Sequence, residues 1–104
     1  MSRQEYDPSR GRIKRTVLFH TMEEGVVTAS TLTALTGLST DSTQGALIRL
    51  REAGLLGWAA DEVMPTTDRR VSGHALTKKG IEAALRIDPS EVIFAKAEAA
   101  GVPA

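Results

Sequence analysis

The side chains best suited to specific chemistry lie close together between Ser42 and Arg49. Gln44 and Arg49 each carry two hydrogen-bonding groups in a fixed geometry, and Ile48 adds an apolar group beside them. A glutamine amide can pair with adenine, an arginine guanidinium can pair with guanine, and an isoleucine can contact the methyl group of thymine. If one helix presents these residues outward together with Ser42 and Gly45, that helix can read base edges in duplex DNA.

The sequence gives no comparable support for catalysis or metal binding. Cysteine is absent, and the two histidines, His20 and His74, are far apart and belong to no HExxH motif. The sequence also contains no glycine-rich phosphate loop. We therefore expect no enzyme activity, no catalytic residue, no cofactor and no metal site. We expect His20 to lie at the surface or to pack, and His74 to be half-buried on a strand.

An amphipathic helix from about Asp41 to Ala53 must position the base-reading residues. One face carries an apolar stripe at helical spacing, made of Thr43, Ala46, Leu47, Leu50 and Ala53. Ser39 can cap the start of this helix, and Gly54 can end it. Gly45 points away from the stripe, although a glycine inside a helix costs about 1 kcal/mol relative to alanine. Its position therefore indicates that the backbone of a ligand approaches closely there.

The segments around this helix complete a compact supersecondary pattern. A first helix is expected over residues 12–24, ending at Gly25. Thr28 can cap a short helix over residues 29–36, and Gly37 then turns the chain into the helix that begins near Asp41, which makes a helix-turn-helix. Residues 55–63 and 71–77 favour extended chain, and the polar residues between them favour a turn. The sequence therefore predicts a hairpin with a polar tip after the helix pair, followed by a helix over residues 78–87.

This order of elements resembles the winged helix-turn-helix regulators, in particular the MarR-like and PadR-like groups. The matching residues are Leu38-Ser39, Leu47, Leu50, Gly54-Leu55, and the run Leu76-Thr77-Lys78-Lys79-Gly80 with Ile81, Ala84 and Leu85 after it. In the family the second run closes the second wing strand and opens the next helix, usually with a proline where Lys78 stands. The resemblance covers roughly residues 12 to 86 and implies a mainly α fold with a small β-hairpin wing. It also implies DNA contacts from the wing tip, at Thr67, Arg69 and Arg70.

Composition and charge indicate one small domain with an uneven distribution of charge. The 104 residues are 41% hydrophobic and 25% charged, and their formal net charge is zero. Residues 1–22 and 63–87 each carry +3, whereas residues 23–62 carry −4 and residues 88–104 carry −2. We expect residues 1–11 to form a flexible basic arm, with Lys14 and Arg15 just beyond it as phosphate contacts. No apolar run approaches the roughly 20 residues of a membrane span, and no signal peptide is evident, so we expect a cytoplasmic protein with no membrane partner.

The C-terminal segment, residues 88–104, is expected to lie outside the domain formed by residues 12–87. The sequence Asp88-Pro89-Ser90-Glu91 is typical of a helix start, and the apolar residues beyond it are Val92, Ile93, Phe94 and Ala97. A helix with so many apolar residues has more surface to bury than a small domain can cover. We therefore expect these residues to form the interface of a homodimer.

Together these features predict sequence-specific binding to double-stranded DNA by a small homodimeric transcriptional regulator, with the second helix of the pair in the major groove. Nothing in the sequence identifies a small-molecule effector. One alternative is a winged helix that serves as a protein-interaction module in a larger assembly, which the acidic middle of the chain supports. Another is an architectural DNA binder, such as a recombination accessory factor, which would use the same face to bend DNA.

Overall fold

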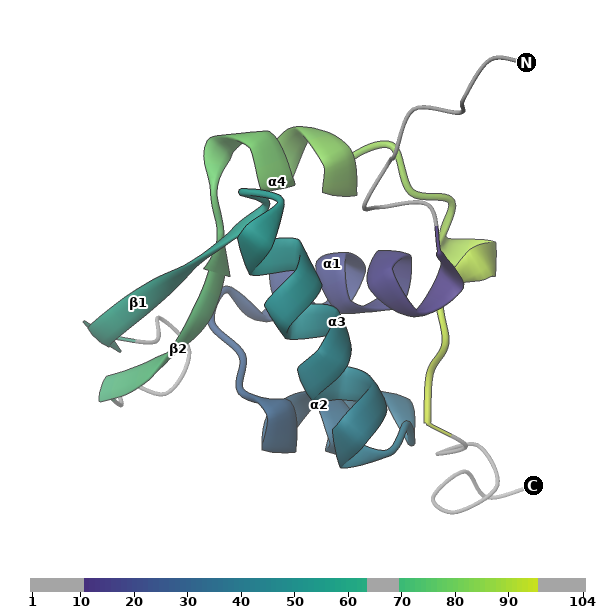
Figure 1. Ribbon diagram of the computed structural model, residues 1–104, viewed down its shortest axis with the longest axis horizontal. Helices are drawn as coiled ribbons and strands as arrows, with labels where there is room; N and C mark the ends of the chain where they lie inside the picture. The colour runs from purple at the N-terminus through teal and green to yellow at the C-terminus, as the bar shows by residue number, and fades with distance from the viewer. Residues whose placement is uncertain (1–10, 64–69, 96–104) are drawn as a thin grey trace.

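Helices and one hairpin follow each other along the chain in the predicted order. The computed structural model describes residues 11–63 and 70–95. Its elements are α1 (Arg12–Glu24), α2 (Ala29–Thr36), α3 (Thr40–Glu52), β1 (Leu56–Val63), β2 (Arg70–Leu76), α4 (Lys78–Ala84) and a short 3-10 helix, η1 (Pro89–Glu91). The helices cluster around α1, and the hairpin projects from one side of the cluster (Figure 1). The predicted fold class, mainly α with a small β-hairpin wing, is therefore confirmed.

The helix pair α2 and α3 is fixed by short-range capping interactions. The hydroxyl of Thr28 accepts a hydrogen bond from the N–H of Thr31 at 3.1 Å, and the hydroxyl of Ser39 accepts one from the N–H of Ser42 at 3.1 Å. Such caps satisfy N–H groups that have no partner inside a helix. Gly37 joins the two helices with φ 74°, a left-handed conformation that glycine adopts without steric cost. The turn therefore needs no residue beyond Gly37, Leu38 and Ser39.

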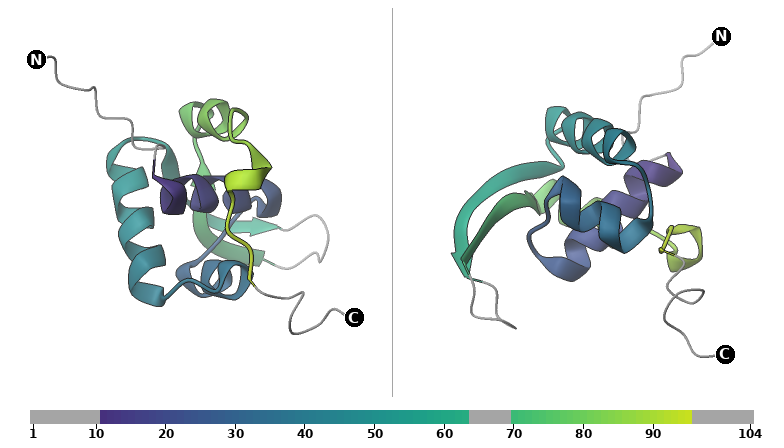
Figure 2. Two further views of the ribbon diagram at one scale, coloured as in Figure 1. Left: turned by 90° about the vertical axis from the view of Figure 1, so that its right-hand side faces the viewer. Right: turned by 90° about the horizontal axis from the view of Figure 1, so that it is seen from below.

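The hydrophobic core lies where α1, α2 and α3 meet the base of the hairpin. Leu18 and Leu32 are fully buried between the helices, and Leu55 and Leu56 are buried where α3 runs into β1. Leu50 is also fully buried, which confirms the apolar stripe of α3. Because this stripe faces α1 and α2, the opposite side of α3 must face away from the core. Figure 2 shows from below how α3 crosses over the other helices and leaves its outer side uncovered by them.

The wing is held at its base by the run from Leu76 to Gly80. β1 and β2 pair antiparallel, with Leu56 opposite Leu76 and Trp58 opposite His74. The hydroxyl of Thr77 donates to the carbonyl of Gly54 at 2.6 Å and accepts from the N–H of Gly80 at 3.1 Å, so one side chain caps α4 and ties it to the end of α3. A Cβ atom at Gly80 would collide with the carbonyl oxygen of Leu55. The run thus closes the wing because only glycine fits at its end.

The predicted C-terminal helix differs from the structure. η1 makes a single 3-10 turn, and residues 92–95 are not helical. The backbone beyond the turn bonds to the rest of the domain: the N–H of Ile93 donates to the hydroxyl of Thr16 at 3.0 Å, and the N–H of Ala95 donates to the carbonyl of Leu35 at 2.8 Å. The prediction of a helix is therefore wrong for residues 92–95, because partners on α1 and α2 replace those within a helix.

The apolar residues of this segment have different environments. Val92 is 5% exposed, Ile93 is half-buried, and Phe94 is 53% exposed. Ala97, the remainder of the predicted helix, and residues 1–10 of the flexible arm predicted over residues 1–11 lie outside the described residues. The helix predicted over residues 78–87 is shorter in the structure, because α4 ends at Ala84 and the chain continues only as a turn.

No helix in the part of the chain that the structure describes is long and apolar enough to cross a membrane.

Candidate nucleic-acid interface

The outer side of α3 presents the residues that were predicted to read bases. Thr43, Ala46, Leu47 and Leu50 are buried against the core. Gln44 and Arg49 are exposed, and Ile48 is 56% exposed. Ser42 and Gly45 are half-buried at the edge of the same surface. The helix therefore displays all five predicted residues on the part of its surface that does not face the core.

These residues are divided between two flanks of α3. A helix turns by about 100° per residue, so Ser42 and Arg49 share one flank while Gln44 lies on the other. Ser42, Gly45 and Arg49 face the start of α1, with which they line a hollow. The strip between the two flanks carries Asp41, Ile48 and Glu52. The strip between the flanks thus carries one carboxylate near each end of the helix. The cations of α3 lie on its flanks instead.

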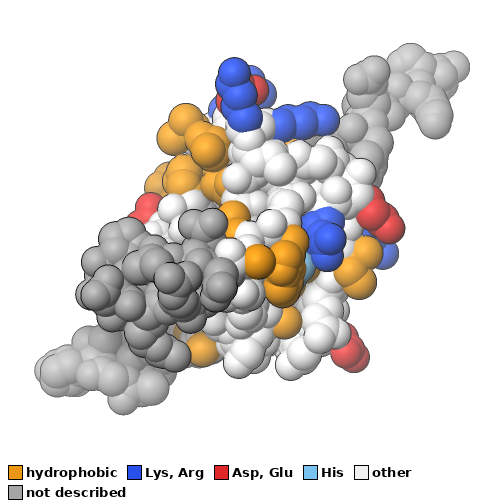
Figure 3. Space-filling view, turned by 90° about the vertical axis from the view of Figure 1, so that its left-hand side faces the viewer, with side chains coloured by type: hydrophobic (Ala, Val, Ile, Leu, Met, Phe, Trp, Pro, Cys, Tyr) orange, Lys and Arg blue, Asp and Glu red, His pale blue; other side chains and the backbone are white. Residues whose placement is uncertain are grey.

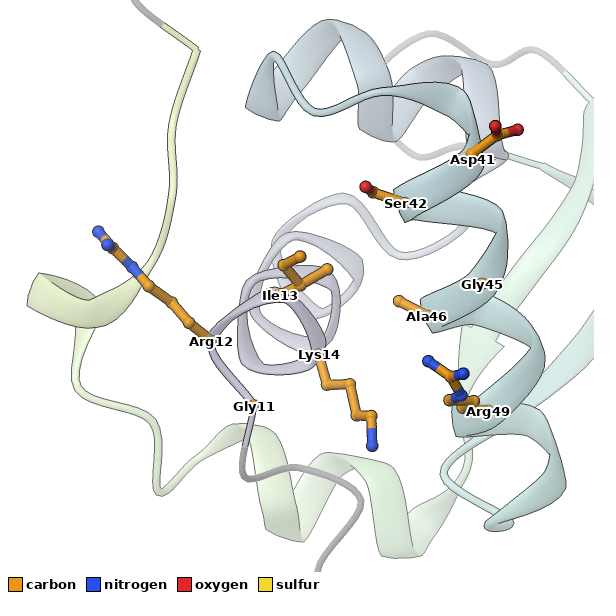
Figure 4. A pocket seen from close by; sticks show the side chains of 9 residues that line it. All are labelled: Gly11, Arg12, Ile13, Lys14, Asp41, Ser42, Gly45, Ala46 and Arg49. Carbon is orange, nitrogen blue, oxygen red and sulfur yellow. The ribbon is translucent and has the colours of Figure 1, made fainter.

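The hollow between α1 and α3 encloses about 590 Å³. It is lined by Gly11, Arg12, Ile13, Lys14, Asp41, Ser42, Gly45, Ala46 and Arg49. Figure 4 shows the side chains of Lys14 and Arg49 reaching into this space from the two helices, whereas the carboxylate of Asp41 points away from it. A Cβ atom at Gly45 would meet nothing within 4 Å. Because Gly45 has no side chain and the space beside it is open, a ligand in the hollow can come closest to the backbone of α3 at this residue.

The electrostatic character of the hollow favours an anion. Gly11 is the N-cap of α1 and provides no side-chain cap, and the first turn of α1 contains no acidic residue. The N–H groups at a helix start carry partial positive charge and readily bind phosphate or carboxylate oxygens. Lys14 and Arg49 add two full positive charges to that end. A phosphate group has the size and the charge to occupy this position.

Two other cations near the start of α1 are engaged within the domain. The Nε atom of Arg15 lies 2.8 Å from the Oε1 atom of Glu91, and the Nε atom of Arg12 donates to the carbonyl oxygen of Glu91 at 3.0 Å. Glu91 belongs to η1, so the C-terminal segment neutralises part of the basic cluster. Arg15, a predicted phosphate contact, would have to leave or share this ion pair to bind DNA. Lys14 and Arg49 line the hollow itself, one from α1 and one from α3.

The predicted wing contacts fall at the limit of what the structure describes. Thr67 and Arg69 lie outside the described residues. Arg70 begins β2 and pairs in register with Val63 of β1. Their role in binding stays a prediction.

One cation of α3 was missed by the sequence analysis. Arg51 is exposed on the flank of α3 that faces the hairpin, and its charge acts on His74 of β2. Its position could have been inferred, because Arg51 is two residues beyond Arg49 and must therefore point to the opposite flank. α3 thus has one cation toward α1 and one toward the wing.

The two histidines occupy structural positions. His20 is 4% exposed, and its Nε2 atom lies 2.9 Å from the carbonyl oxygen of Ile93. His74 is half-buried as predicted, and its ring packs edge-on against Trp58. Burial, followed by the charge of Arg51, holds the pKa of His74 below its ordinary value. Among the described residues, no three histidine or carboxylate side chains gather where they could hold a metal ion.

The arrangement defines a winged helix-turn-helix fold, and comparison with solved structures agrees. The chain is similar to Lactococcus lactis ZitR, whose C30S variant superposes with a TM-score of 0.60 at 19% sequence identity. The match covers 82% of this chain and 55% of the ZitR chain, so this chain corresponds to about half the length of that protein. No protein-family model and no curated protein sequence matches the chain. The likeness therefore shows the fold.

Proposed function

We propose that this protein binds double-stranded DNA through α3 and acts as a small transcriptional regulator. The observation that carries the proposal is the hollow between α1 and α3, which Lys14 and Arg49 line from two helices beside the open backbone of Gly45. A phosphate of a DNA strand fits this hollow while α3 lies in the adjacent major groove. The fold shared with ZitR supports the same function in one respect, because a helix-turn-helix commonly places its second helix in the major groove.

Within this proposal the residues of α3 have two kinds of contact. Gln44 and Ile48 point outward on the uncovered surface and would meet base edges, Gln44 by pairing with adenine and Ile48 by contacting thymine methyl groups. Arg49 points into the hollow with Lys14, so it would bind phosphate rather than guanine. Discrimination between sequences then depends on Gln44 and Ile48, and overall affinity depends on Lys14 and Arg49.

We also propose that the protein binds DNA as a homodimer, which would place two α3 helices on a pseudo-palindromic site. The C-terminal segment offers the exposed ring of Phe94 as a contact, although Val92 is already covered by its own domain. Sedimentation of the wild-type chain beside Phe94→Ser tests this proposal. A wild-type dimer that the substitution converts to monomer supports it, and a monomeric wild type at micromolar concentration rejects it.

A second function, binding to a protein partner, is favoured by the centre of the α3 surface. Asp41 and Glu52 carry negative charge at the two ends of the outer strip, and Ile48 lies exposed between them. Carboxylates repel DNA phosphates, whereas an apolar side chain framed by charges suits a protein interface. A partner that binds through this strip would be lost on Ile48→Asp and kept on Lys14→Ala, which removes a cation of the hollow outside the strip.

The experiment that tests DNA binding uses a fluorescently labelled duplex of mixed sequence. Its anisotropy is followed as the purified protein is added at about 50 mM salt, where phosphate contacts are strong. Saturable binding, followed by enrichment of preferred sequences from a random duplex pool, supports sequence-specific recognition. Absence of binding to any duplex at low salt rejects the proposed function.

A further inference from the structure

The base of the wing carries an exposed aromatic ring that takes no part in the contacts proposed between α3 and DNA. Trp58, the single tryptophan of the chain, lies on β1 and is 56% exposed. Its ring packs against that of His74 on β2, with ring centroids 5.2 Å apart and ring planes at 89°. The indole of Trp58 thus lies at the surface, where it packs on His74 and not on the core.

At His74 the hairpin is also hydrogen-bonded to the segment before α2. The N–H of His74 donates to the carbonyl of Val27 at 2.7 Å, and the N–H of Val27 donates to the carbonyl of His74 at 2.9 Å. Gly73 permits the contact, because a Cβ atom there would collide with the carbonyl oxygen of Val27. The segment before α2 thus pairs with β2 at His74, on the edge of β2 opposite to β1 and Trp58. β2 is therefore paired on both of its edges at His74, the residue that contacts the indole.

The part of the hairpin that carries Trp58 and His74 faces the flank of α3 that carries Arg51. The guanidinium of Arg51 is close enough to His74 to act on the charge of its imidazole. Figure 3 views the molecule from the side of the wing, and hydrophobic side chains lie at the surface there beside Lys or Arg side chains. Arg51, Trp58 and His74 form one surface between α3 and the hairpin, which we call the wing-base surface.

We propose that the wing-base surface holds the sugar-phosphate backbone of a DNA strand as it passes from α3 to the wing. Arg51 neutralises a phosphate, the face of the Trp58 indole packs on a deoxyribose, and the indole N–H donates to a phosphate oxygen. His74 is a positioning residue that keeps the indole upright. The inference rests on the proposed DNA-binding function and extends it to residues outside those predicted from the sequence to contact DNA.

The chemistry of the surface favours a DNA backbone over a protein. A stable protein interface buries about 800 Å² on each partner and has several apolar anchors at its centre. Side chains alternate along a strand, so the preceding neighbour of Trp58 on its own face of β1 is Leu56, which is buried and offers no second exposed apolar anchor. The charge that acts on this face from α3 is that of the cation Arg51. One ring with one adjacent cation matches the alternation of sugar and phosphate along a DNA strand.

The test uses the fluorescence of Trp58 in the intact chain, because no other residue is a tryptophan. Quenching by acrylamide, a neutral molecule, is measured with and without a saturating duplex of mixed sequence, and saturation is established independently from the anisotropy of a labelled duplex. The expected result is a fall of about twofold or more in the quenching constant, since the DNA strand covers the indole. A saturated complex with unchanged quenching overturns the inference and leaves the proposed function intact.

Two further outcomes also contradict the inference. Failure of any duplex to bind rejects both the inference and the proposed function. Protection of Trp58 when the protein alone is concentrated assigns the surface to a second copy of the chain and overturns the DNA assignment.

Substitutions give a second measurement. Trp58→Ala should weaken binding to all duplexes by about five- to tenfold without changing the salt dependence, and Arg51→Ala should reduce the slope of log K against log salt by about 1. Leu85→Ala is the matched control, because Leu85 lies just after the end of α4, is 69% exposed, and should leave binding unchanged. Equal effects of Trp58→Ala and Leu85→Ala overturn the inference.

The role of His74 has its own readout. His74→Ala should lower the fluorescence anisotropy of Trp58 in the DNA-free protein, because the ring loses its neighbour, and His74→Phe should restore it. A merely structural role would change the stability of the protein without changing the motion of the indole, and that result would remove His74 from the proposal.

Discussion

The hydroxyl of Thr16 accepts a hydrogen bond of 3.0 Å from the backbone N–H of Ile93, which joins the buried face of α1 to the C-terminal segment. His20, one turn further along α1, meets the carbonyl of the same residue at 2.9 Å. Both backbone groups of Ile93 are thus satisfied by side chains of α1. The segment after η1 is part of the domain, and it brings Glu91 to the cations of α1.

Thr16→Val is expected to destabilise the domain by about 0.5 to 1.5 kcal/mol, because it removes the hydrogen bond to the part-buried N–H of Ile93. Thr33→Val is the control, since the hydroxyl of Thr33 makes only a long contact of 3.5 Å with Thr43. Urea unfolding measures both variants. Equal stability of the two would show that the C-terminal segment is not held by this bond.

Gly45→Ala is expected to stabilise the free protein by about 0.5 to 1 kcal/mol, because alanine is the better helix former. The added methyl group meets nothing within 4 Å, so no clash offsets the gain. The same methyl group narrows the approach of a DNA strand to α3, and binding should weaken. Thermal unfolding and duplex titration measure the two effects, and a variant that is more stable with unchanged binding would remove Gly45 from the interface.

Gly80→Ala should have the opposite effect on stability. Its Cβ atom would collide with the carbonyl oxygen of Leu55, so the start of α4 must move away from the end of α3. We expect a loss of about 1 to 3 kcal/mol, as for other overpacked sites, in spite of the higher helix propensity of alanine. Urea unfolding beside Gly45→Ala makes the comparison. A Gly80→Ala variant as stable as the wild type would mean that the close contact at the base of the wing is not required.

Stability is expected to fall as the pH decreases below about 6.5, through His74. Burial, followed by the charge of Arg51, holds the pKa of folded His74 below its ordinary value of 6.5. Below pH 6.5 the unfolded chain therefore takes up a proton that the folded chain binds less readily, and the stabilisation present above that pH is progressively lost. Urea unfolding of the wild type and of His74→Gln between about pH 5 and 8 measures this. An equally steep dependence in both proteins would assign it to another group.

The parts of the fold that sequence could predict are those governed by local chemistry. The starts of α2, α3 and α4 were predictable because Thr28, Ser39 and Thr77 cap the residues that immediately follow them. The end of the chain was not. Asp88 and Pro89 begin a 3-10 turn as readily as an α-helix, and the distant partners Thr16 and Leu35 then keep residues 92–95 extended.

The candidate site shows the same division. Helical periodicity within α3 was sufficient to show that Arg49 points away from the hydrophobic core of the domain. It could not show that Arg49 and Lys14 line the same hollow, because that depends on how α1 packs across α3. Nor could it show that Arg15 is engaged by Glu91, since the ion pair requires the C-terminal segment to fold back. Contacts between distant segments are decided by packing, which spacing within one helix does not describe.

The salt dependence of DNA binding by Lys14→Ala with Arg49→Ala, compared with the wild type, tests the central claim most directly. If the hollow between α1 and α3 holds DNA phosphate, the double variant should bind every duplex more weakly, and its slope of log K against log salt should be shallower by about 2. Arg86→Ala, which removes an exposed cation outside the hollow, should change the slope little. A folded double variant whose affinity and slope equal those of the wild type would contradict the proposed interface.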